Sequence, residues 1–310
     1  MKKLILICSL LLVFVSPFIG EVDIDLHKLT DASSIDYRVL VNLRIPHIIL
    51  AFLAGGILSL SGVVFQVIFR NPISTPYTLG VASGATLFSA IAIILGLGAY
   101  SSLFAFVGAM STVLILFAVA MYIKEYSPNS LLLIGIALSF FYSATLMVMF
   151  YISTLQESYE ILRFTMGSLD TLGYKHISIL FVSIVLFAIV LYRYKQEFRL
   201  LLTSYEFAHL QGIKVKQVSY ILLFGVSVVI GVCVSITGPI GFVGLVIPHI
   251  IKAIYKQSTD KLLVEMFFYG GVFLVLCDLI ARNMTQTQIP IGIVTSFIGA
   301  PFFIYLLVRK

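Results

Sequence analysis

The chain has few of the residues on which soluble enzymes and nucleic-acid-binding proteins depend. Charged residues make up only 11% of its 310 residues, and tryptophan is absent. The net charge is +6, but the basic residues are scattered between apolar runs, and this pattern argues against nucleic acid as a partner. Cys8, Cys233 and Cys277 stand singly in apolar segments, which indicates buried apolar side chains rather than metal ligands.

Motifs for chemistry on a bound substrate are also absent. The sequence has no Gly-x-x-x-x-Gly-Lys-Ser/Thr loop, so the chain has no phosphate cradle of its own. Neither His-Glu-x-x-His nor Gly-x-Ser-x-Gly occurs, and the five histidines are dispersed. The sequence therefore predicts a protein that is not an enzyme, with no catalytic residues, no bound cofactor and no metal ligands.

Apolar residues, in contrast, make up 60% of the chain, and the mean hydropathy is +1.09. A helix needs about 20 apolar residues to span a bilayer, so this composition is typical of a multi-pass membrane protein. We expect one all-α transmembrane domain over residues 1–310. Its ten expected spans are 4–20, 45–69, 77–97, 100–123, 131–152, 177–192, 218–237, 240–255, 262–281 and 290–308.

Two of these spans have an alternative. The two lysines and apolar run at the N-terminus are similar to a secretory signal, but Ser16–Gly20 is a poor cleavage site, and we favour an uncleaved first span. The segment 240–255 is short and rich in glycine, so it is either a transmembrane helix or a re-entrant piece.

The basic residues orient these helices through the positive-inside rule. With the N-terminus in the cytoplasm and ten spans, the 20 Lys and Arg residues divide into 14 inside and 6 outside. We therefore expect both termini in the cytoplasm. The outer segments would be 21–43, a candidate short amphipathic helix, and 153–176, which is broken by Gly167 and Gly173. The longest cytoplasmic loop would be 193–217.

Ionisable residues inside the spans are scarce. Asp278 is the only acidic residue well inside a span, apart from Glu265 near the inner end of the ninth. Because ion-driven transporters place such groups at membrane depth, a secondary transporter is the weaker interpretation, and a separate ATPase at the cytoplasmic face is the simpler energy source. A membrane scaffold is a third hypothesis, which the lack of a soluble domain weakens. Asp278 lies four residues before Arg282, and this spacing predicts an ion pair near the outer face.

Glycine and proline interrupt two further segments. The apolar run Gly238–Ile251 contains breakers at five positions, Gly238, Pro239, Gly241, Gly244 and Pro248. Because each freed backbone group in lipid needs a partner, this run predicts either a hinge beside a substrate path or a close packing contact. In the 193–217 loop, Gly212 predicts the left-handed end of a short helix, with a second short helix starting near Val215. These two helices would form a knob for a partner's groove, or an ordinary capped loop.

Taken in order, several motifs resemble one family. They are Leu43–His47, Ala54–Gln66, Arg70–Pro76, Leu79–Ala85, Glu206–Gly212, Gly238–His249, Asp278–Arg282, Ile289–Gly292 and Ile298–Phe302. From about residue 40 to the C-terminus, the chain is similar to the FecCD/BtuC-like permease subunits of bacterial ABC importers, which take up iron–siderophores, haem and vitamin B12 with the help of a binding protein.

The resemblance implies a fold, a function and partners. The fold would be the ten-helix, BtuC-like permease fold of type II ABC importers, in the bacterial inner membrane and surrounded by lipid. The permease would pair with a second copy or a similar permease, with two ATPase subunits below it and a soluble or lipid-anchored binding protein outside. ATP would be used by the ATPase alone. The cargo would be a metal chelate, foremost an iron(III)–siderophore or related iron complex, with vitamin B12 or haem as the alternative.

The resemblance also implies three groups of site residues. The ATPase-coupling loop would comprise Glu206, Ala208, Gly212, Lys214 and Lys216, and the cytoplasmic gate Asn71, Pro72 and Ile73. Arg44, His47 and Arg282 would dock the binding protein, a role that suits arginine because its guanidinium pairs bidentately with carboxylates.

The chain departs from the family pattern at three positions. His47 stands where the family usually has a second arginine, so that docking contact is either lost or sensitive to pH. Gln288 replaces an acidic residue before Ile289-Pro290, and the usual tryptophan ahead of Met166-Gly167 is missing, with Phe164 nearby.

Overall fold

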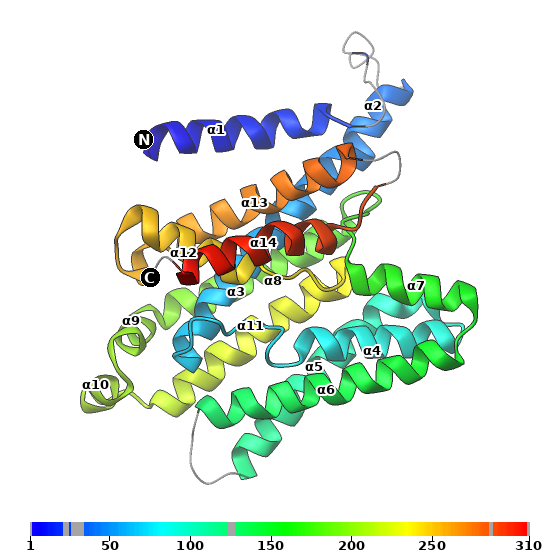
Figure 1. The fold of residues 1–310 in the computed structure, drawn as a ribbon. Helices are drawn as coiled ribbons and strands as arrows, with labels where there is room; N and C mark the ends of the chain where they lie inside the picture. The colour runs from blue at the N-terminus through cyan, green and yellow to red at the C-terminus, as the bar shows by residue number, and fades with distance from the viewer. Residues whose placement is uncertain (1, 21–24, 26–33, 123–127, 285–287, 309–310) are drawn as a thin grey trace.

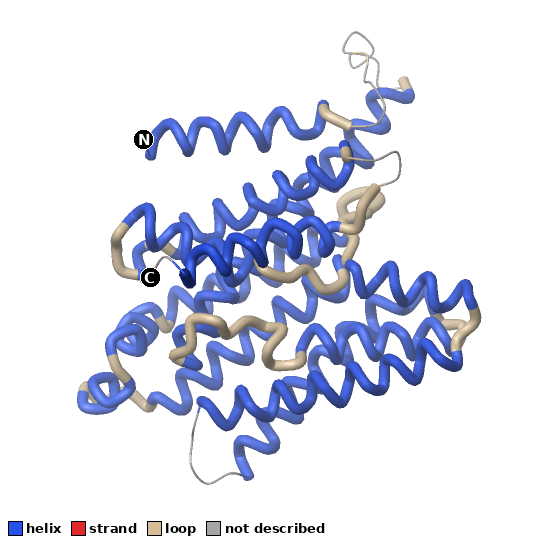
Figure 2. The backbone as a smooth tube through the Cα atoms, viewed as in Figure 1, coloured by secondary structure: helices blue, strands red, loops and turns tan. Residues whose placement is uncertain are grey.

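The computed structural model describes residues 2–20, 25, 34–122, 128–284 and 288–308, and every regular element within these ranges is helical (Figure 2). The all-α class expected from the sequence is therefore confirmed. The helices are α1 (Lys2–Val15), α2 (Ile35–Val39), α3 (Ile45–Phe69), α4 (Val81–Ile94), α5 (Ser101–Tyr122), α6 (Pro128–Ile152), α7 (Leu155–Met166), α8 (Lys175–Arg193), α9 (Lys195–Thr203), α10 (Tyr205–Leu210), α11 (Val215–Thr237), α12 (Val243–Tyr255), α13 (Leu263–Asn283) and α14 (Ile291–Val308), with short η1 (Ser16–Phe18), η3 (Leu40–Arg44), η4 (Gly98–Tyr100) and η5 (Thr259–Lys261).

Helix α3 is the central element of the bundle, and nearly all of its side chains are buried. It packs against α13, α12, α11 and α8. Glycines permit the contacts with α13 and α12. A Cβ on Gly55 would lie 2.3 Å from the carbonyl oxygen of Gly270 in α13, and a Cβ on Gly62 would lie 1.9 Å from the carbonyl oxygen of Gly244 in α12. Backbones that approach so closely leave no room for a side chain, which is how small residues pack helices in membranes.

A second group of helices surrounds α4, which packs against α5, α6 and α7, while α11 contacts both α3 and α4 and joins the two groups. Helix α6 lies on the outside, with only 17% of its most apolar window buried. Since its exposed residues are large and apolar, for example Phe140, Phe141 and Met147, this face suits lipid or another protein.

Each of the ten expected spans coincides with a helix, but the helices differ in length. Six are long and apolar enough to cross a membrane, and shorter apolar helices cover Ile5–Phe18, Val81–Ile94, Val243–Tyr255 and Ile291–Tyr305. At about 1.5 Å per residue, the 13 residues of α12 extend about 20 Å, less than the ~30 Å of a hydrocarbon core. That all ten helices cross the membrane completely therefore stays a prediction. For the segment 240–255, both a transmembrane helix and a re-entrant piece remain possible assignments.

Two helices start a few residues after the beginning of their expected spans. The span expected at 77–97 forms a helix only from Val81, because Gly80 has φ +76° and ends a run of turns. The span expected at 240–255 forms a helix only from Val243, because Phe242 has φ +67°. A left-handed residue cannot continue a right-handed helix, so each helix begins at the residue that follows the left-handed one.

The segment expected at 153–176 contains a helix, α7, that is not among the expected spans. Thr154 caps the start of α7: its hydroxyl accepts the backbone N–H of Glu157, and the Glu157 carboxylate accepts that of Thr154. This capping box is a sequence signal, Thr-x-x-Glu, that could have predicted α7. Of the outer segment expected at 21–43, residues 21–24 and 26–33 lie outside the described residues, and the remainder contains the short α2.

The bundle has two distinct ends (Figure 1). The start of α1, the end of α14 and the short helices α9 and α10 lie at one end, called here the α10 end. Helices α2 and α7 lie at the other, called here the α7 end. This arrangement places the start of the first helix and the end of the last at the same end, as the even number of expected spans requires.

Candidate functional site

The loop expected at 193–217 contains two short helices at the α10 end, and the predicted coupling residues lie in and after the second of them. Helices α9 and α10 are separated by Ser204, whose φ of −164° is extended. Gly212 has φ +81°, which confirms its predicted left-handed conformation. A second helix does start at Val215, as predicted, but it is not short. No proline or left-handed residue separates Val215 from the apolar run that follows, so the helix continues as α11 to Thr237.

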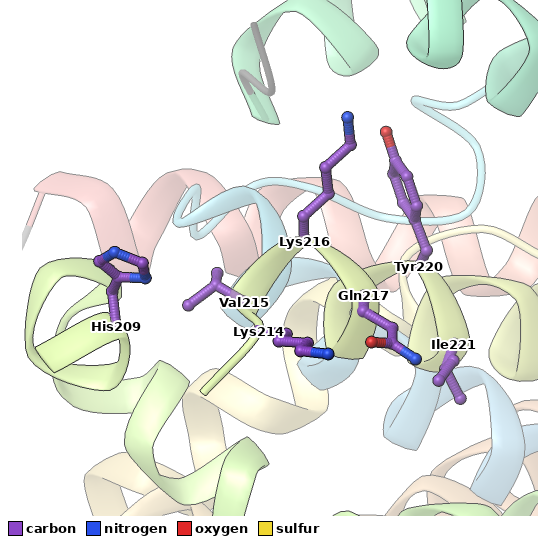
Figure 3. Close-up of a pocket in the computed structure, with 7 residues that line it drawn as sticks. All are labelled: His209, Lys214, Val215, Lys216, Gln217, Tyr220 and Ile221. Atoms are coloured by element: carbon purple, nitrogen blue, oxygen red, sulfur yellow. The ribbon is translucent and has the colours of Figure 1, made fainter. Parts of the chain in front are cut away.

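Most of the predicted coupling residues face solvent. Glu206, Gly212, Lys214 and Lys216 are exposed, whereas Ala208 is buried in the core and anchors α10. A shallow groove of about 680 Å³ lies beside them (Figure 3), lined by His209, Lys214, Val215, Lys216, Gln217, Tyr220 and Ile221. The Lys216 and Tyr220 side chains point the same way, with the ammonium 5.8 Å from the ring centre. The α10 end therefore presents an exposed basic groove.

The predicted gate residues follow directly after the central helix, also at the α10 end. Helix α3 ends at Arg70, which has φ +48°. The Asn71 side chain then accepts a hydrogen bond from the backbone N–H of Ile73 at 3.1 Å, a local turn that keeps Pro72 and Ile73 exposed. The structure therefore brings the predicted gate and the predicted coupling loop to one end of the bundle.

The five residues of the predicted hinge motif lie in two different places. Gly238, Pro239 and Gly241 belong to the connection between α11 and α12, whereas Gly244 and Pro248 lie within α12. Gly238 has φ +66°, and a Cβ there would lie 2.3 Å from the carbonyl oxygen of Phe164 in α7. This position needs glycine both for conformation and for close packing, and whether it also acts as a hinge remains a prediction.

Two adjoining cavities lie beside this connection, with Tyr77, Thr165 and Pro239 in the lining of both. The larger, about 770 Å³, also contacts Met166, Gly241 and several residues of α14, and the smaller, about 170 Å³, extends between α4 and α6. Their polar lining consists of the hydroxyls of Tyr77, Ser83, Thr86, Tyr142, Ser143, Thr165 and Ser296, and the rest is apolar or glycine. None of these residues could be recognised in the sequence as a group, because single hydroxyls in separate helices form no motif.

The three predicted docking residues lie near the α7 end, where Arg44 and His47 are buried within the chain and Arg282 is largely covered. With Asp278 they form what is called here the ionic cluster: Arg44, His47, Asp278 and Arg282. Asp278 Oδ1 lies 2.7 Å from His47 Nε2, and Asp278 Oδ2 lies 2.8 Å from an Arg282 guanidinium nitrogen. The predicted Asp278–Arg282 ion pair is confirmed, whereas the partnership of His47 with Asp278 was not foreseen.

The segment after α1 covers this cluster. Arg44 donates a hydrogen bond to the carbonyl oxygen of Pro17 at 3.2 Å, and Arg282 donates one to that of Ile19 at 3.5 Å. A buried charge is stable only when it is paired or hydrogen-bonded, and these contacts supply the partners that the two arginines need inside the chain. Docking of a binding protein by these residues stays a prediction.

A metal centre is not built into the described residues. No group of three or more His, Cys, Asp or Glu side chains gathers there in a way that could hold a metal ion. Of the three cysteines, Cys233 and Cys277 are buried in separate helices and Cys8 is exposed on α1.

Comparison with known proteins gives consistent results over the whole chain. The model of the FecCD transport family matches residues 6–309. A "Probable iron chelatin transport system permease protein" of Helicobacter pylori is 37% identical, over 87% of this chain and 82% of its own. The hemin transport system permease protein HmuU of Yersinia pestis is 31% identical, over 100% of this chain and 96% of its own. Other relatives are permeases for molybdate and for vitamin B12 import.

A solved structure agrees with these sequence matches. The chain is similar to a metal-chelate type ABC transporter in an inward-facing conformation, with a TM-score of 0.87 and 29% identity, over 99% of this chain and 100% of that one. The family match, the relatives and the apolar helices together make this a multi-pass inner membrane protein and a permease rather than an enzyme. The chain belongs to the FecCD transport family of ABC importer permeases.

Proposed function

We propose that this permease carries a metal chelate, foremost an iron(III)–siderophore or related iron complex, across the inner membrane. The observation that carries the proposal is the lining of the two adjoining cavities, which combines apolar groups with hydroxyls from five helices and connections. A bare cation is bound by carboxylates, imidazoles or thiolates, whereas a chelate brings its own ligands and presents an organic surface. Hydroxyls and apolar walls suit such a surface without holding it tightly.

The names of the relatives support this cargo class. The iron chelatin permease is 37% identical and the hemin permease 31% identical to this chain. Haem and vitamin B12 are the alternative cargoes, and they share with an iron chelate a metal enclosed in an organic ligand. A secondary transporter without an ATPase is a weaker interpretation still.

The exposed α10 end is the proposed ATPase surface, and it faces the cytoplasm together with both termini. Glu206, Gly212, Lys214 and Lys216 would contact two ATPase subunits, which bind and hydrolyse the ATP, and Asn71–Ile73 would form the gate beside them. Nucleotide would act because the ATPase states differ in their affinity for the outward- and inward-facing permease, and that difference moves the equilibrium.

The remaining partners are a second permease and a binding protein. The larger cavity is lined by residues of α7 and α14, including Phe297, which is 80% exposed, and a second copy or a similar permease would cover this face. The binding protein would dock at the α7 end. For Arg44 and Arg282 to pair with its carboxylates, the carbonyls of Pro17 and Ile19 must first be released.

The experiment is uptake into proteoliposomes that contain the permease with its ATPase and binding protein. We expect ATP-dependent uptake of a labelled ferric siderophore, and not of vitamin B12, haemin or molybdate at equal concentration. Uptake of one of these instead would reassign the cargo, and uptake without ATP would remove the importer assignment.

A variant pair tests the ATPase surface. Glu206→Gln should lower the amount of ATPase that copurifies with the permease, whereas Glu160→Gln, an exposed glutamate on α7 at the opposite end, should leave it unchanged. Equal copurification of the ATPase with the two variants would place the ATPase contact elsewhere.

A further inference from the structure

Tyr205 connects two segments that are far apart in the sequence. It is the first residue of α10, immediately before Glu206. Its hydroxyl donates a hydrogen bond to the carbonyl oxygen of Ile68, in the last turn of α3. The Arg70 guanidinium lies over its ring, with Cζ 5.5 Å from the ring centre. The half-buried Tyr205 side chain thus contacts one residue inside the last turn of α3 and one residue just after its end. The predicted gate begins at the next residue, Asn71.

The end of α3 is a place where such a contact has a physical effect. The last carbonyl groups of a helix have no partner within the helix, and the Tyr205 hydroxyl supplies one at Ile68. Arg70 takes φ +48°, an uncommon conformation for a residue with a Cβ, so the chain turns sharply there before Asn71. An arginine held over an aromatic ring by electrostatic attraction resists displacement. The Tyr205 contacts therefore stabilise the turn that positions the gate residues.

Other anchors of α10 do not reach the gate. Ala208 is buried against the core and fixes α10 to the bundle in general. The exposed residues of the coupling loop, such as Gly212, Lys214 and Lys216, point to solvent and contact no part of residues 70–73 through any hydrogen bond or ion pair among the described residues. The contact of Tyr205 with Ile68 and Arg70 is a direct physical link between the two segments.

We propose that Tyr205 is the positioning residue that transmits movement of α10 to the gate Asn71–Ile73. When the ATPase changes nucleotide state and displaces α10, Tyr205 carries Ile68 and Arg70 with it, and the turn after α3 moves. This inference rests on the proposed function, because it takes α10 as the ATPase contact and residues 71–73 as the gate.

The test compares substitutions at Tyr205 with a matched tyrosine. The readout is the amount of substrate transported per ATP hydrolysed by the complete transporter in proteoliposomes. For Tyr205→Ala we expect normal copurification of the ATPase, ATP hydrolysis within twofold of wild type, and uptake reduced at least tenfold. Tyr205→Phe retains the ring over Arg70 and loses only the donor, so its uptake should fall two- to fivefold.

Tyr194→Ala is the control, because Tyr194 also lies at the α10 end beneath an arginine, Arg193 at 5.8 Å, but does not contact the end of α3 by any described hydrogen bond or ring contact. It should transport as wild type does per ATP. An equal loss in Tyr194→Ala and Tyr205→Ala, or an unchanged ratio in Tyr205→Ala, would overturn the proposal.

A double-mutant cycle separates transmission from a general structural role. Arg70→Gln should itself lower transport per ATP. Adding Tyr205→Ala should cause little further loss, because the two substitutions remove the same contact between Tyr205 and Arg70. Additive losses would contradict the link. If Tyr205→Ala fails to fold, Tyr205→Phe still tests the proposal, through its own loss of transport per ATP.

Spin labels on the exposed positions Ile73 and Gln211, in a variant without the native cysteines, provide the direct readout. Nucleotide should shift both labels in the wild type, and only the Gln211 label in Tyr205→Ala. An Ile73 label that still responds in Tyr205→Ala would exclude Tyr205 as the transmitting residue. If the wild-type chain binds no ATPase, the proposed function fails instead, and the two failures are distinguishable.

Discussion

One group of charged side chains is turned inward at the α7 end of the bundle, whereas two lysines are turned outward at the α10 end. The ionic cluster is largely buried, and its members contact one another or the carbonyls of Pro17 and Ile19. At the α10 end, Lys214 and Lys216 line an open groove and are exposed. Buried charges of this kind are part of the fold, because removing one leaves its partner unpaired. Exposed charges contribute little to stability and are available to a partner.

The largest expected effect comes from breaking the ionic cluster. Asp278→Ala would leave Arg282 buried without its carboxylate, so we expect a loss of about 3–5 kcal/mol in the free energy of unfolding. Asp170→Ala is the control, since Asp170 pairs with Arg163 at 2.8 Å but the two side chains are 48% and 61% exposed. That pair should contribute less than about 1 kcal/mol. Thermal and denaturant unfolding in detergent measure both, and equal losses would remove the contrast between buried and exposed charge.

A second comparison uses two glycines with matched geometry. Gly212 at the α10 end and Gly173 in the α7-to-α8 connection have φ of +81° and +68°, and no atom lies within 4 Å of a Cβ at either position. Alanine at either site should therefore cost about 1–2 kcal/mol, from backbone conformation alone. Only Gly212→Ala should also reduce ATP-driven uptake. A similar loss of uptake in Gly173→Ala would mean that general destabilisation, and not the α10 end, limits transport.

Neutralising the groove should change binding without changing stability. For Lys214→Gln combined with Lys216→Gln we expect the free energy of unfolding to stay within about 0.5 kcal/mol of wild type. Because each lost charge should remove roughly 0.5 kcal/mol of binding free energy, affinity for the ATPase should fall about fivefold. The difference in affinity between the variant and the wild type should shrink at high salt, which screens the charges. Titration of the ATPase at two salt concentrations measures this. Lys175→Gln, an exposed lysine at the start of α8, should have neither effect.

The smallest expected effect is a pH dependence at the α7 end. Burial alone would raise the pKa of Asp170, but hydrogen bonds from Ser168 and Arg163 lower it below its ordinary value of 3.8. Because the folded-state pKa is the lower one, ionised Asp170 stabilises the fold above pH 3.8, and this contribution is lost as the pH falls through the folded-state pKa. Asp170→Asn should flatten the fall in melting temperature in this acid range. An unchanged slope would show that Asp170 contributes nothing there.

Local features of the site could be predicted because they depend on neighbours in the sequence. The Asp278–Arg282 pair follows from helical spacing, and the left-handed Gly212 follows from a glycine after a short helix. The partnership of His47 with Asp278 could not be predicted in this way, because the two residues are 231 positions apart. The cavity hydroxyls come from separate helices for the same reason. Helix α7, in contrast, had a local signal in Thr154 and Glu157.

The sequence by itself determined that this is an all-α membrane protein, where its apolar helices lie and which family it belongs to. A bilayer requires long apolar runs, and these are visible without a fold. Only the tertiary structure decided which faces and charges are buried. In α3 and α6 alike the residues are apolar on every side, so no periodicity distinguishes the buried helix from the exposed one. Burial was decided by the close contacts of Gly55 and Gly62 with α13 and α12, which involve residues distant in the chain.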